Sequence, residues 1–172
     1  TVIDYHVTNN IINNDIQKNH FSEDAKTATV IPTYKKKERE IIENYRTVRL
    51  LTCFSKVYEK FLLEKLTPFV DNFLSKYMAA YRKNYSSNHV LIWLIETWKH
   101  NLDNNFFVGT VLMDLSKAFD CIPHDLLVAK LHAYYFSENA LVFFYSYLKS
   151  RKQNAKINGF SSNLQTILSG VP

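Results

Sequence analysis

The most informative feature of this chain is Asp114-Leu115-Ser116-Lys117-Ala118-Phe119-Asp120, which directly follows the apolar run Phe106-Phe107-Val108-Gly109-Thr110-Val111-Leu112-Met113. The run is rich in Val, Leu and Phe and is too short for a typical helix, so it predicts a buried strand. Asp114 would then stand at a strand end, where open sheets bind ligands and where a carboxylate could hold a metal ion. The spacing alone leaves a second interpretation open, in which Asp114 only ends the strand or caps a helix.

The composition indicates a chain that can bury a core. Of its 172 residues, 47% are hydrophobic and 15% are aromatic, so we expect one or two compact units. Because the sequence begins at Thr1 and stops on the loop signal Ser169-Gly170-Val171-Pro172, we expect it to be part of a longer polypeptide.

The two cysteines indicate a reducing environment. Cys53 and Cys121 form no Cys-x-x-Cys pair, so the sequence predicts neither a zinc site nor a disulfide framework. We therefore expect an intracellular protein, in the nucleus and cytoplasm, that is not secreted. No apolar segment approaches the roughly 20 residues that span a bilayer, so no membrane partner is expected.

The charge balance favours a polyanionic partner. The chain has 21 Lys and Arg against 16 Asp and Glu, a net charge of +5. The basic residues gather at 35–37, 46–49, 82–83 and 149–152. These clusters could converge on one groove, although four separate surface patches would give the same pattern.

Hydrophobic periodicity predicts the other elements. Helices are expected over 1–25, from Ser55 to near Pro68, after Ser86-Ser87, after Pro123 and over 141–148; strands are expected over 28–34, 153–157 and 164–168, with an exposed basic loop at 35–40.

The order of these pieces resembles the reverse transcriptase domain of non-LTR retrotransposons, closest to the jockey-like group, over essentially the whole chain. The residues that carry the likeness are Val30-Ile31-Pro32-Thr33-Tyr34-Lys35-Lys36-Lys37; Asn44-Tyr45-Arg46 with Ser55-Lys56-Val57-Tyr58-Glu59-Lys60; Tyr81-Arg82-Lys83 with Ser86-Ser87 and His89; and the heptapeptide with His124-Asp125-Leu126-Leu127 and Lys130-Leu131. The tail, from Ser146-Tyr147-Leu148 through Arg151 and Gln153 to Gly170-Val171-Pro172, extends it.

The resemblance implies an α+β fold, a partial right-hand polymerase in which helices pack on a small, mainly antiparallel sheet. Residues 1–27 would form an N-terminal helical segment, 28–105 the fingers and 106–172 a partial palm. The implied partners are an RNA template, a DNA primer and deoxynucleoside triphosphates.

The resemblance also implies a metal site. Nucleotidyl transfer in this family uses two Mg²⁺ ions, which hard carboxylate oxygens hold. Asp114 matches the first metal-binding and catalytic Asp, and the carbonyl of Leu115 matches a backbone ligand. Because two further adjacent aspartates of the family are not in this sequence, we expect the site to be incomplete here, and whether this chain alone is an enzyme stays open.

Other residues match family positions that contact nucleotide or nucleic acid. Arg46 and Lys36 match finger residues that hold the triphosphate, and Phe119 matches the aromatic under the incoming sugar. A core Phe and a solvated lysine loop remain alternatives. Lys56, Arg82 and Lys83 are assigned to the backbone of template or primer, whereas Asp120 and His124 are expected to make local hydrogen bonds or to start a helix.

Several departures from the family pattern favour a second hypothesis. Ala80, Asn84 and Tyr135 stand where relatives have glycine or another small or helix-breaking residue, Thr47 replaces a usual Pro, and Tyr135 would be strained if its turn needs positive φ. The alternative function is therefore a non-catalytic, nucleic-acid-binding remnant of a degenerate element. A metal-dependent nuclease and a group II intron type of reverse transcriptase rank below these two.

Overall fold

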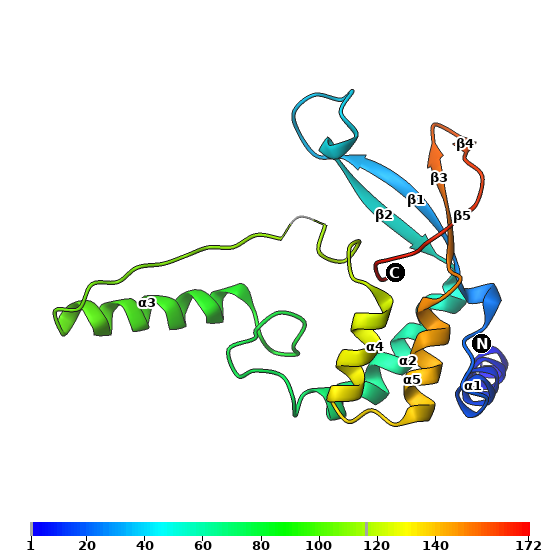
Figure 1. Cartoon of the computed structure of the whole chain (residues 1–172), viewed down its shortest axis with the longest axis horizontal. Coiled ribbons are helices and arrows are strands. Elements are labelled where there is room, and N and C mark those ends of the chain that lie inside the picture. The colour runs from blue at the N-terminus through cyan, green and yellow to red at the C-terminus, as the bar shows by residue number, and fades with distance from the viewer. Residues whose placement is uncertain (1, 116) are drawn as a thin grey trace. The chain divides into compact units, whose positions relative to one another are not determined.

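The computed structural model describes the backbone of residues 2–115 and 117–172, and the side chains from residue 9 onward (Figure 1). It divides into two units, which are described separately: Thr1–Lys65 with Lys117–Pro172, and Leu66–Ser116. The described residues form five α-helices and a five-stranded mixed sheet, which confirms the predicted α+β class. None of the described helices is long and apolar enough to cross a membrane.

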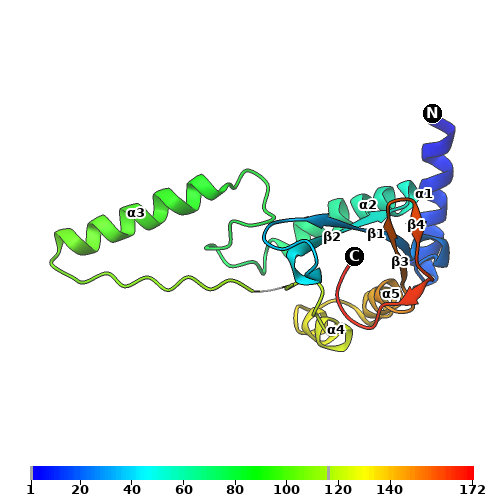
Figure 2. The ribbon, with the colours of Figure 1, turned by 90° about the horizontal axis from the view of Figure 1, so that it is seen from above.

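The first unit holds the sheet and most of the helices. In chain order they are α1 (Val2–Gln17), the 3-10 turn η1 (Glu23–Ala25), β1 (Thr27–Tyr34), the turn η2 (Ile42–Asn44), β2 (Tyr45–Leu51), the start of α2 (Cys53–Val70), α4 (His124–Ala133), α5 (Glu138–Leu148), β3 (Lys152–Ile157), β4 (Phe160–Ser161) and β5 (Gln165–Thr166). Helices α4 and α5 lie side by side in both views (Figure 1, Figure 2).

The sheet has the strand order β2-β1-β3-β4, and β5 also pairs with β3. Among the described strands only the β1–β3 pairing is parallel, so the sheet is mainly antiparallel as expected. In the register, Val30 lies opposite Arg49, and Ala28 lies opposite both Leu51 and Gln153. Since side chains alternate along a strand, Arg49 and Gln153 share one face with the buried Ala28 and Val30.

Aromatic side chains form the core of the first unit. Phe21 is fully buried, and its ring centroid lies 4.6 Å from that of Tyr58 on α2 and 4.9 Å from that of Tyr147 on α5. Phe143 stacks on Tyr58 at 6.4 Å, and Ile12 of α1 completes the cluster. The chain between α1 and β1 therefore joins three helices through one ring.

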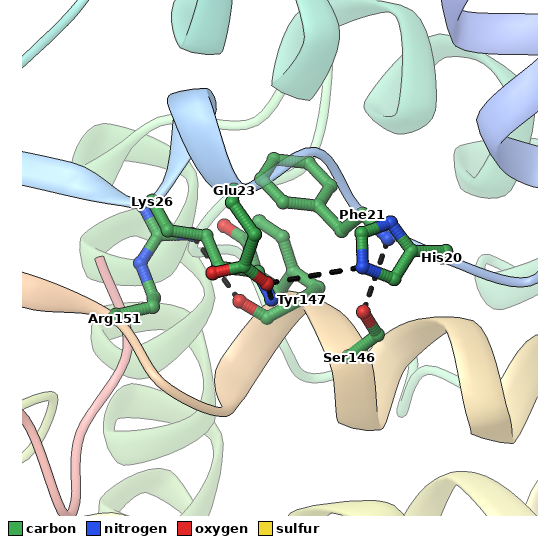
Figure 3. Close-up of polar contacts among 7 residues, drawn as sticks. All are labelled: His20, Phe21, Glu23, Lys26, Ser146, Tyr147 and Arg151. Carbon is green, nitrogen blue, oxygen red and sulfur yellow. Dashed lines mark hydrogen bonds and ion pairs between the residues drawn. The ribbon is translucent and has the colours of Figure 1, made fainter.

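Two polar groups next to this core form hydrogen bonds, and Figure 3 shows the first of them. The Phe21 amide donates to Ser146 Oγ at 3.1 Å, and the Tyr147 hydroxyl donates to Glu59 Oε1 at 2.9 Å. Burial, reinforced by the Glu59 carboxylate, raises the pKa of Tyr147, and burial lowers the pKa of Arg151. Arg151 is only 3% exposed and places its guanidinium 5.0 Å from the Tyr147 ring.

The second unit contains the rest of α2 and the helix α3 (Ser87–Asp103). Ser86 precedes the first turn of α3, as predicted, and accepts the His89 amide through its carbonyl at 3.1 Å. No described residue of this unit is buried. The apolar face that the sequence predicts for α3 is therefore largely exposed, with Leu91 54% and Leu102 59% accessible.

The strand predicted over 106–113 is wrong for this structure. These residues form neither helix nor strand, and Phe107, Leu112 and Met113 are 104%, 90% and 89% exposed. A strand needs a neighbour for its backbone groups, and no described strand pairs with this segment. Two smaller differences are that α2 continues past Pro68 to Val70, and that the strand predicted over 164–168 is limited to β5.

The prediction of backbone strain at Tyr135 is confirmed. Tyr135 has φ 62° and Asn84 has φ 67°. At the end of α4, the amide of Phe136 donates to the Leu131 carbonyl at 3.3 Å and that of Tyr135 to the His132 carbonyl at 2.9 Å. This is the Schellman arrangement, whose left-handed position usually carries glycine, whereas Ala80 is not among the residues with positive φ.

We predict that Tyr135→Gly raises the free energy of unfolding by about 1 kcal/mol, because glycine adopts the left-handed conformation without the penalty that a β-carbon brings. Urea unfolding followed by circular dichroism measures the change. Tyr134→Gly is the matched control, since Tyr134 has φ −92° and glycine there should destabilise. Equal losses in both variants would contradict this account.

Candidate functional site

An ion pair connects the end of the heptapeptide to the sheet of the first unit. Arg49 Nη2 on β2 donates to Asp120 Oδ1 at 2.5 Å, and the two side chains are only 18% and 31% exposed. Arg49 Nη1 also donates to the carbonyl of Val171 at 3.3 Å. Arg49 thus holds two segments that are distant in sequence, and partial burial shields the pair from solvent screening.

A close backbone approach reinforces this connection. The Gly170 amide donates to the Ile122 carbonyl at 2.8 Å, and the Val171 amide donates to the Phe119 carbonyl at 2.9 Å. Gly170 has φ 86°, and a β-carbon there would lie 2.8 Å from the carbonyl oxygens of Phe119 and Asp120. Both the conformation and the space therefore require glycine.

Side chains complete the contact between the two segments. His124 Nε2 donates to the Gly170 carbonyl at 2.8 Å, and Ser169 Oγ donates to the Asp120 carbonyl at 3.2 Å. His124 is the first residue of α4, as predicted. Of the two roles predicted for Asp120 and His124, starting a helix is confirmed for His124, whereas the hydrogen bonds of both side chains are not local, because their partners lie 71 and 46 residues away.

A polar cleft of about 380 Å³ lies at this junction. Its lining residues are Val30, Thr47, Arg49, Lys117, Asp120, Gln153 and the segment 166–169. Arg49 Nε and Gln153 Oε1 are buried and have no hydrogen-bond partner among the described residues. Both atoms are enclosed, and the charged side chains of the lining are Arg49, Asp120 and Lys117, so the cleft has a net positive charge.

Four predicted site residues lie in the first unit, but none of them lines the cleft. Arg46 is exposed on the opposite face of β2 from Arg49, beside Thr33. Lys36 is exposed in the loop after β1, Lys56 is exposed on α2, and Phe119 is 53% exposed.

The loop that carries Lys36 is ordered by hydrogen bonds. Tyr45 Oη donates to the Arg39 carbonyl and Asn44 Nδ2 to the Glu38 carbonyl, each at 2.8 Å, and Tyr34 Oη donates to the Lys37 carbonyl. The predicted basic loop is confirmed as an exposed and defined turn.

The other predicted residues lie in the second unit. Asp114 and Leu115 are exposed in the segment 106–115, which forms no strand, so the expected place for Asp114 at a strand end is wrong for this structure. Ser116, between them and Lys117, lies outside the described residues. Lys83 is exposed, whereas Arg82 contacts the Ser75 carbonyl at 3.4 Å and Asp71 at 3.9 Å.

The described residues do not by themselves form a magnesium site. They contain no group of three or more His, Cys, Asp or Glu side chains that could hold a metal ion. One carboxylate and one carbonyl cannot supply the octahedral oxygen shell that Mg²⁺ prefers, so further ligands are required.

A family model described as "Reverse transcriptase (RNA-dependent DNA polymerase)" matches residues 34–171, which is most of the chain. The chain belongs to the reverse transcriptase family. It is also similar to the RNA-directed DNA polymerase from mobile element jockey of Drosophila melanogaster, with 24% identity, and to that of Drosophila funebris, with 22%. A probable RNA-directed DNA polymerase from transposon BS of Drosophila melanogaster is 24% identical.

These comparisons confirm the resemblance to the reverse transcriptases of non-LTR elements. Each of the three alignments covers 94% of this chain and 18% of the relative. The chain therefore spans less than a fifth of the length of these relatives. The matched region includes the heptapeptide and the Gly170 segment that contacts it.

Sequence reasoning missed Arg49 as a structural residue of this reverse transcriptase chain. It recognised Arg49 only as part of the basic cluster 46–49, because net charge shows no partner. The closing Gly170-Val171-Pro172 was recognised as a motif, but its contact with Phe119 and Asp120 depends on the tertiary fold. The sequence did carry a signal for strand β2. Tyr45, Thr47 and Arg49 alternate there with Val48 and Leu50.

We predict that Arg49 and Asp120 couple in stability. The variants Arg49→Gln, Asp120→Asn and the double variant should give a coupling energy of about 1 kcal/mol or more in urea unfolding, because they remove one partly buried, charge-assisted hydrogen bond.

The matched control is Arg46→Gln combined with Asp120→Asn. Arg46 belongs to the same strand but to its other face, so these two changes should add. Additive effects in the Arg49 cycle would refute the role of the ion pair.

Proposed function

We propose that this chain is part of an RNA-directed DNA polymerase of a non-LTR retrotransposon, which copies RNA into DNA from a primer. The observation that carries the proposal is the family match over 34–171, which includes Asp114 and the residues around it. The relatives are named RNA-directed DNA polymerases. Because the chain spans only 18% of their length, the activity belongs in this proposal to the complete polypeptide.

In this proposal, residues 28–105 contribute the fingers and residues from 106 onward begin the palm, after the N-terminal helical segment 1–27. The β1–β2 hairpin supports the first assignment, because its loop presents an exposed basic surface. The contact between Asp120 and the Gly170 segment supports the second, because it joins two family motifs in one unit.

We assign Asp114 and the carbonyl of Leu115 to a magnesium site that residues elsewhere in the polypeptide complete. Both residues are exposed, so Asp114 keeps its oxygens accessible to an ion. When two Mg²⁺ ions are bound, they neutralise negative charge on the phosphates.

Arg46 and Lys36 are proposed to hold the triphosphate of the incoming nucleotide. Arg46 projects from β2 on the face opposite the cleft, and Lys36 lies in the adjoining exposed loop. A guanidinium fork binds two phosphate oxygens at once, and a lysine adds a point charge.

Phe119 is proposed to lie under the sugar and to exclude a 2′-hydroxyl. Its backbone is fixed by the hydrogen bond from the Val171 amide, and its side chain is half exposed. A fixed backbone limits how far the ring can retreat from a bulkier sugar.

Lys56, Arg82 and Lys83 are proposed to contact phosphates of the template or primer. Lys56 and Lys83 are exposed, which suits salt-dependent phosphate contacts. Arg82 already contacts the Ser75 carbonyl and Asp71 in the second unit, so it would contact a phosphate while it keeps the loop before α3 ordered.

A second candidate function is a nucleic-acid-binding remnant without catalysis. The observation that favours it is the positive φ of Tyr135 and Asn84, where glycine would relieve the strain. An inactive copy could collect such residues, whereas an active polymerase must tolerate them. Primer extension by the complete polypeptide separates the two functions.

We predict that Asp114→Asn in the complete polymerase abolishes primer extension and leaves template binding nearly unchanged, because an amide is a poor magnesium ligand. Extension of a labelled DNA primer on an RNA template measures the rate. Asp103→Asn, another exposed carboxylate of the second unit, is the control and should retain activity. Extension by Asp114→Asn at the wild-type rate would disprove the metal assignment.

We predict that Phe119→Val in the complete polymerase admits ribonucleotides, because a smaller side chain leaves room for the 2′-hydroxyl. The measurement is the ratio of kcat/KM for a deoxynucleotide and its ribonucleotide. Phe107→Val, a fully exposed Phe outside the motif, should leave the ratio unchanged. An unaltered ratio in Phe119→Val would remove Phe119 from the sugar site.

A further inference from the structure

The second unit contains a pocket of about 400 Å³ that none of the roles above uses. Its residues come from the loop before α3 and from the first two turns of α3. Figure 1 shows this loop and helix. Its lining residues are Lys76, Tyr77, Ala79, Tyr85, His89, Val90 and Trp93. The lining contains aromatic rings and a cation but no carboxylate, so a ligand with planar apolar faces and negative charge fits it.

Two large aromatic rings are accessible in this pocket. The ring centroids of Tyr77 and Trp93 lie 5.3 Å apart with an interplanar angle of 46°, and the residues are 63% and 51% exposed. The rings support each other without covering each other. A third planar group can stack on the ring surface that neither the other ring nor Lys76 covers.

Cations lie directly beside the rings. Lys76 Nζ is 5.0 Å from the centroid of Tyr77, and the Arg82 guanidinium is 4.9 Å from the centroid of Tyr85. Arg82 is held there by the Ser75 carbonyl at 3.4 Å and the Asp71 carboxylate at 3.9 Å, and its side chain is only 18% exposed. Lys76 thus brings positive charge into the pocket lining, and Arg82, paired with Asp71, lies against the Tyr85 ring of that lining.

His89 adds a hydrogen-bond donor. Its Nδ1 accepts the amide of Ser86 at 3.2 Å, so the neutral ring carries its proton on Nε2. The Tyr85 ring lies 6.1 Å from the His89 ring and fixes the other side of the pocket. A polar edge of a base or a phosphate oxygen can accept from Nε2.

We propose that this pocket binds an unstacked base of a single-stranded nucleic acid, with the base on Trp93 and Tyr77 and its phosphates beside Lys76 and Arg82. Alternating aromatic and basic side chains are the feature that sequence-tolerant single-strand binding requires. A duplex keeps its bases stacked and cannot supply one. An apolar peptide would have to strip water from Lys76 without giving it a counter-charge. This binding rests on the proposed function, because nucleic acid is the partner in both, and it adds the residues that contact one base.

The test measures binding of labelled 12-nucleotide single-stranded RNA, single-stranded DNA and duplex DNA to this chain by fluorescence anisotropy. Trp93→Leu should weaken binding of both single strands about tenfold and leave duplex binding unchanged. Trp98→Leu is the matched control, because Trp98 belongs to the same helix, is 36% exposed and does not line the pocket. It should stay within about twofold of wild type.

Salt dependence separates stacking from charge. Trp93→Leu should retain the wild-type slope of log Kd against log salt, whereas Lys76→Gln should lower it by about one. Tyr77→Leu changes an exposed loop residue and should weaken single-strand binding as Trp93→Leu does. It is the decisive variant if circular dichroism shows that Trp93→Leu disturbs α3. RNA and DNA strands that respond equally identify the base as the bound group, and a loss confined to RNA identifies a contact with the 2′-hydroxyl as well.

Unchanged single-strand binding in both Trp93→Leu and Tyr77→Leu would overturn the proposal, and so would an equal loss for the duplex. The outcome is independent of catalysis. A complete polypeptide that fails to extend primers but shows the Trp93-dependent affinity would refute the polymerase function and keep the pocket.

Discussion

The ion pair between Arg49 and Asp120, together with the absence of a side chain at Gly170, is the constraint on which the first unit depends. Gly170 can approach the carbonyl groups of Phe119 and Asp120 only because nothing projects from its α-carbon. Arg49 then fixes the same point to β2 and to Val171. Residues of two family motifs thereby share one rigid junction, and Phe119 takes its backbone position from that junction. A half-buried charge without its partner would be costly, so both contacts act together.

The two units differ in how their apolar surface is used. The first buries Phe21, Tyr58 and Phe143 around one cluster, which stabilises the scaffold. The described residues of the second bury no side chain, and its aromatic rings stay accessible. Exposed aromatic surface beside lysine and arginine is typical of a surface that a ligand covers. The second unit is in this account the part of the chain whose surface nucleic acid completes, while the first supplies a preformed support.

Local pattern predicted the elements whose partners are close in sequence. The strand at β1, the helix after Ser86 and the strained turn at Tyr135 follow from periodicity, capping and backbone sterics, and all are present. The predictions that failed concern distant partners. The segment 106–113 has strand composition but no strand to pair with, and charge counting could not show that Arg49 bonds to Asp120. For the same reason the helical periodicity could not show that Trp93 of α3 lines an open pocket.

In the proposed function Asp114 binds metal, while Asp120 stabilises the fold through Arg49. The most direct measurement replaces Mg²⁺ by Fe²⁺ in the complete polymerase with its RNA template and DNA primer, and maps the peptide bonds that locally generated hydroxyl radicals cut. The account predicts cleavage next to Asp114 and Leu115, and none centred on Asp120. Cleavage centred on Asp120 and His124, with the peptide bonds around Asp114 intact, would contradict it.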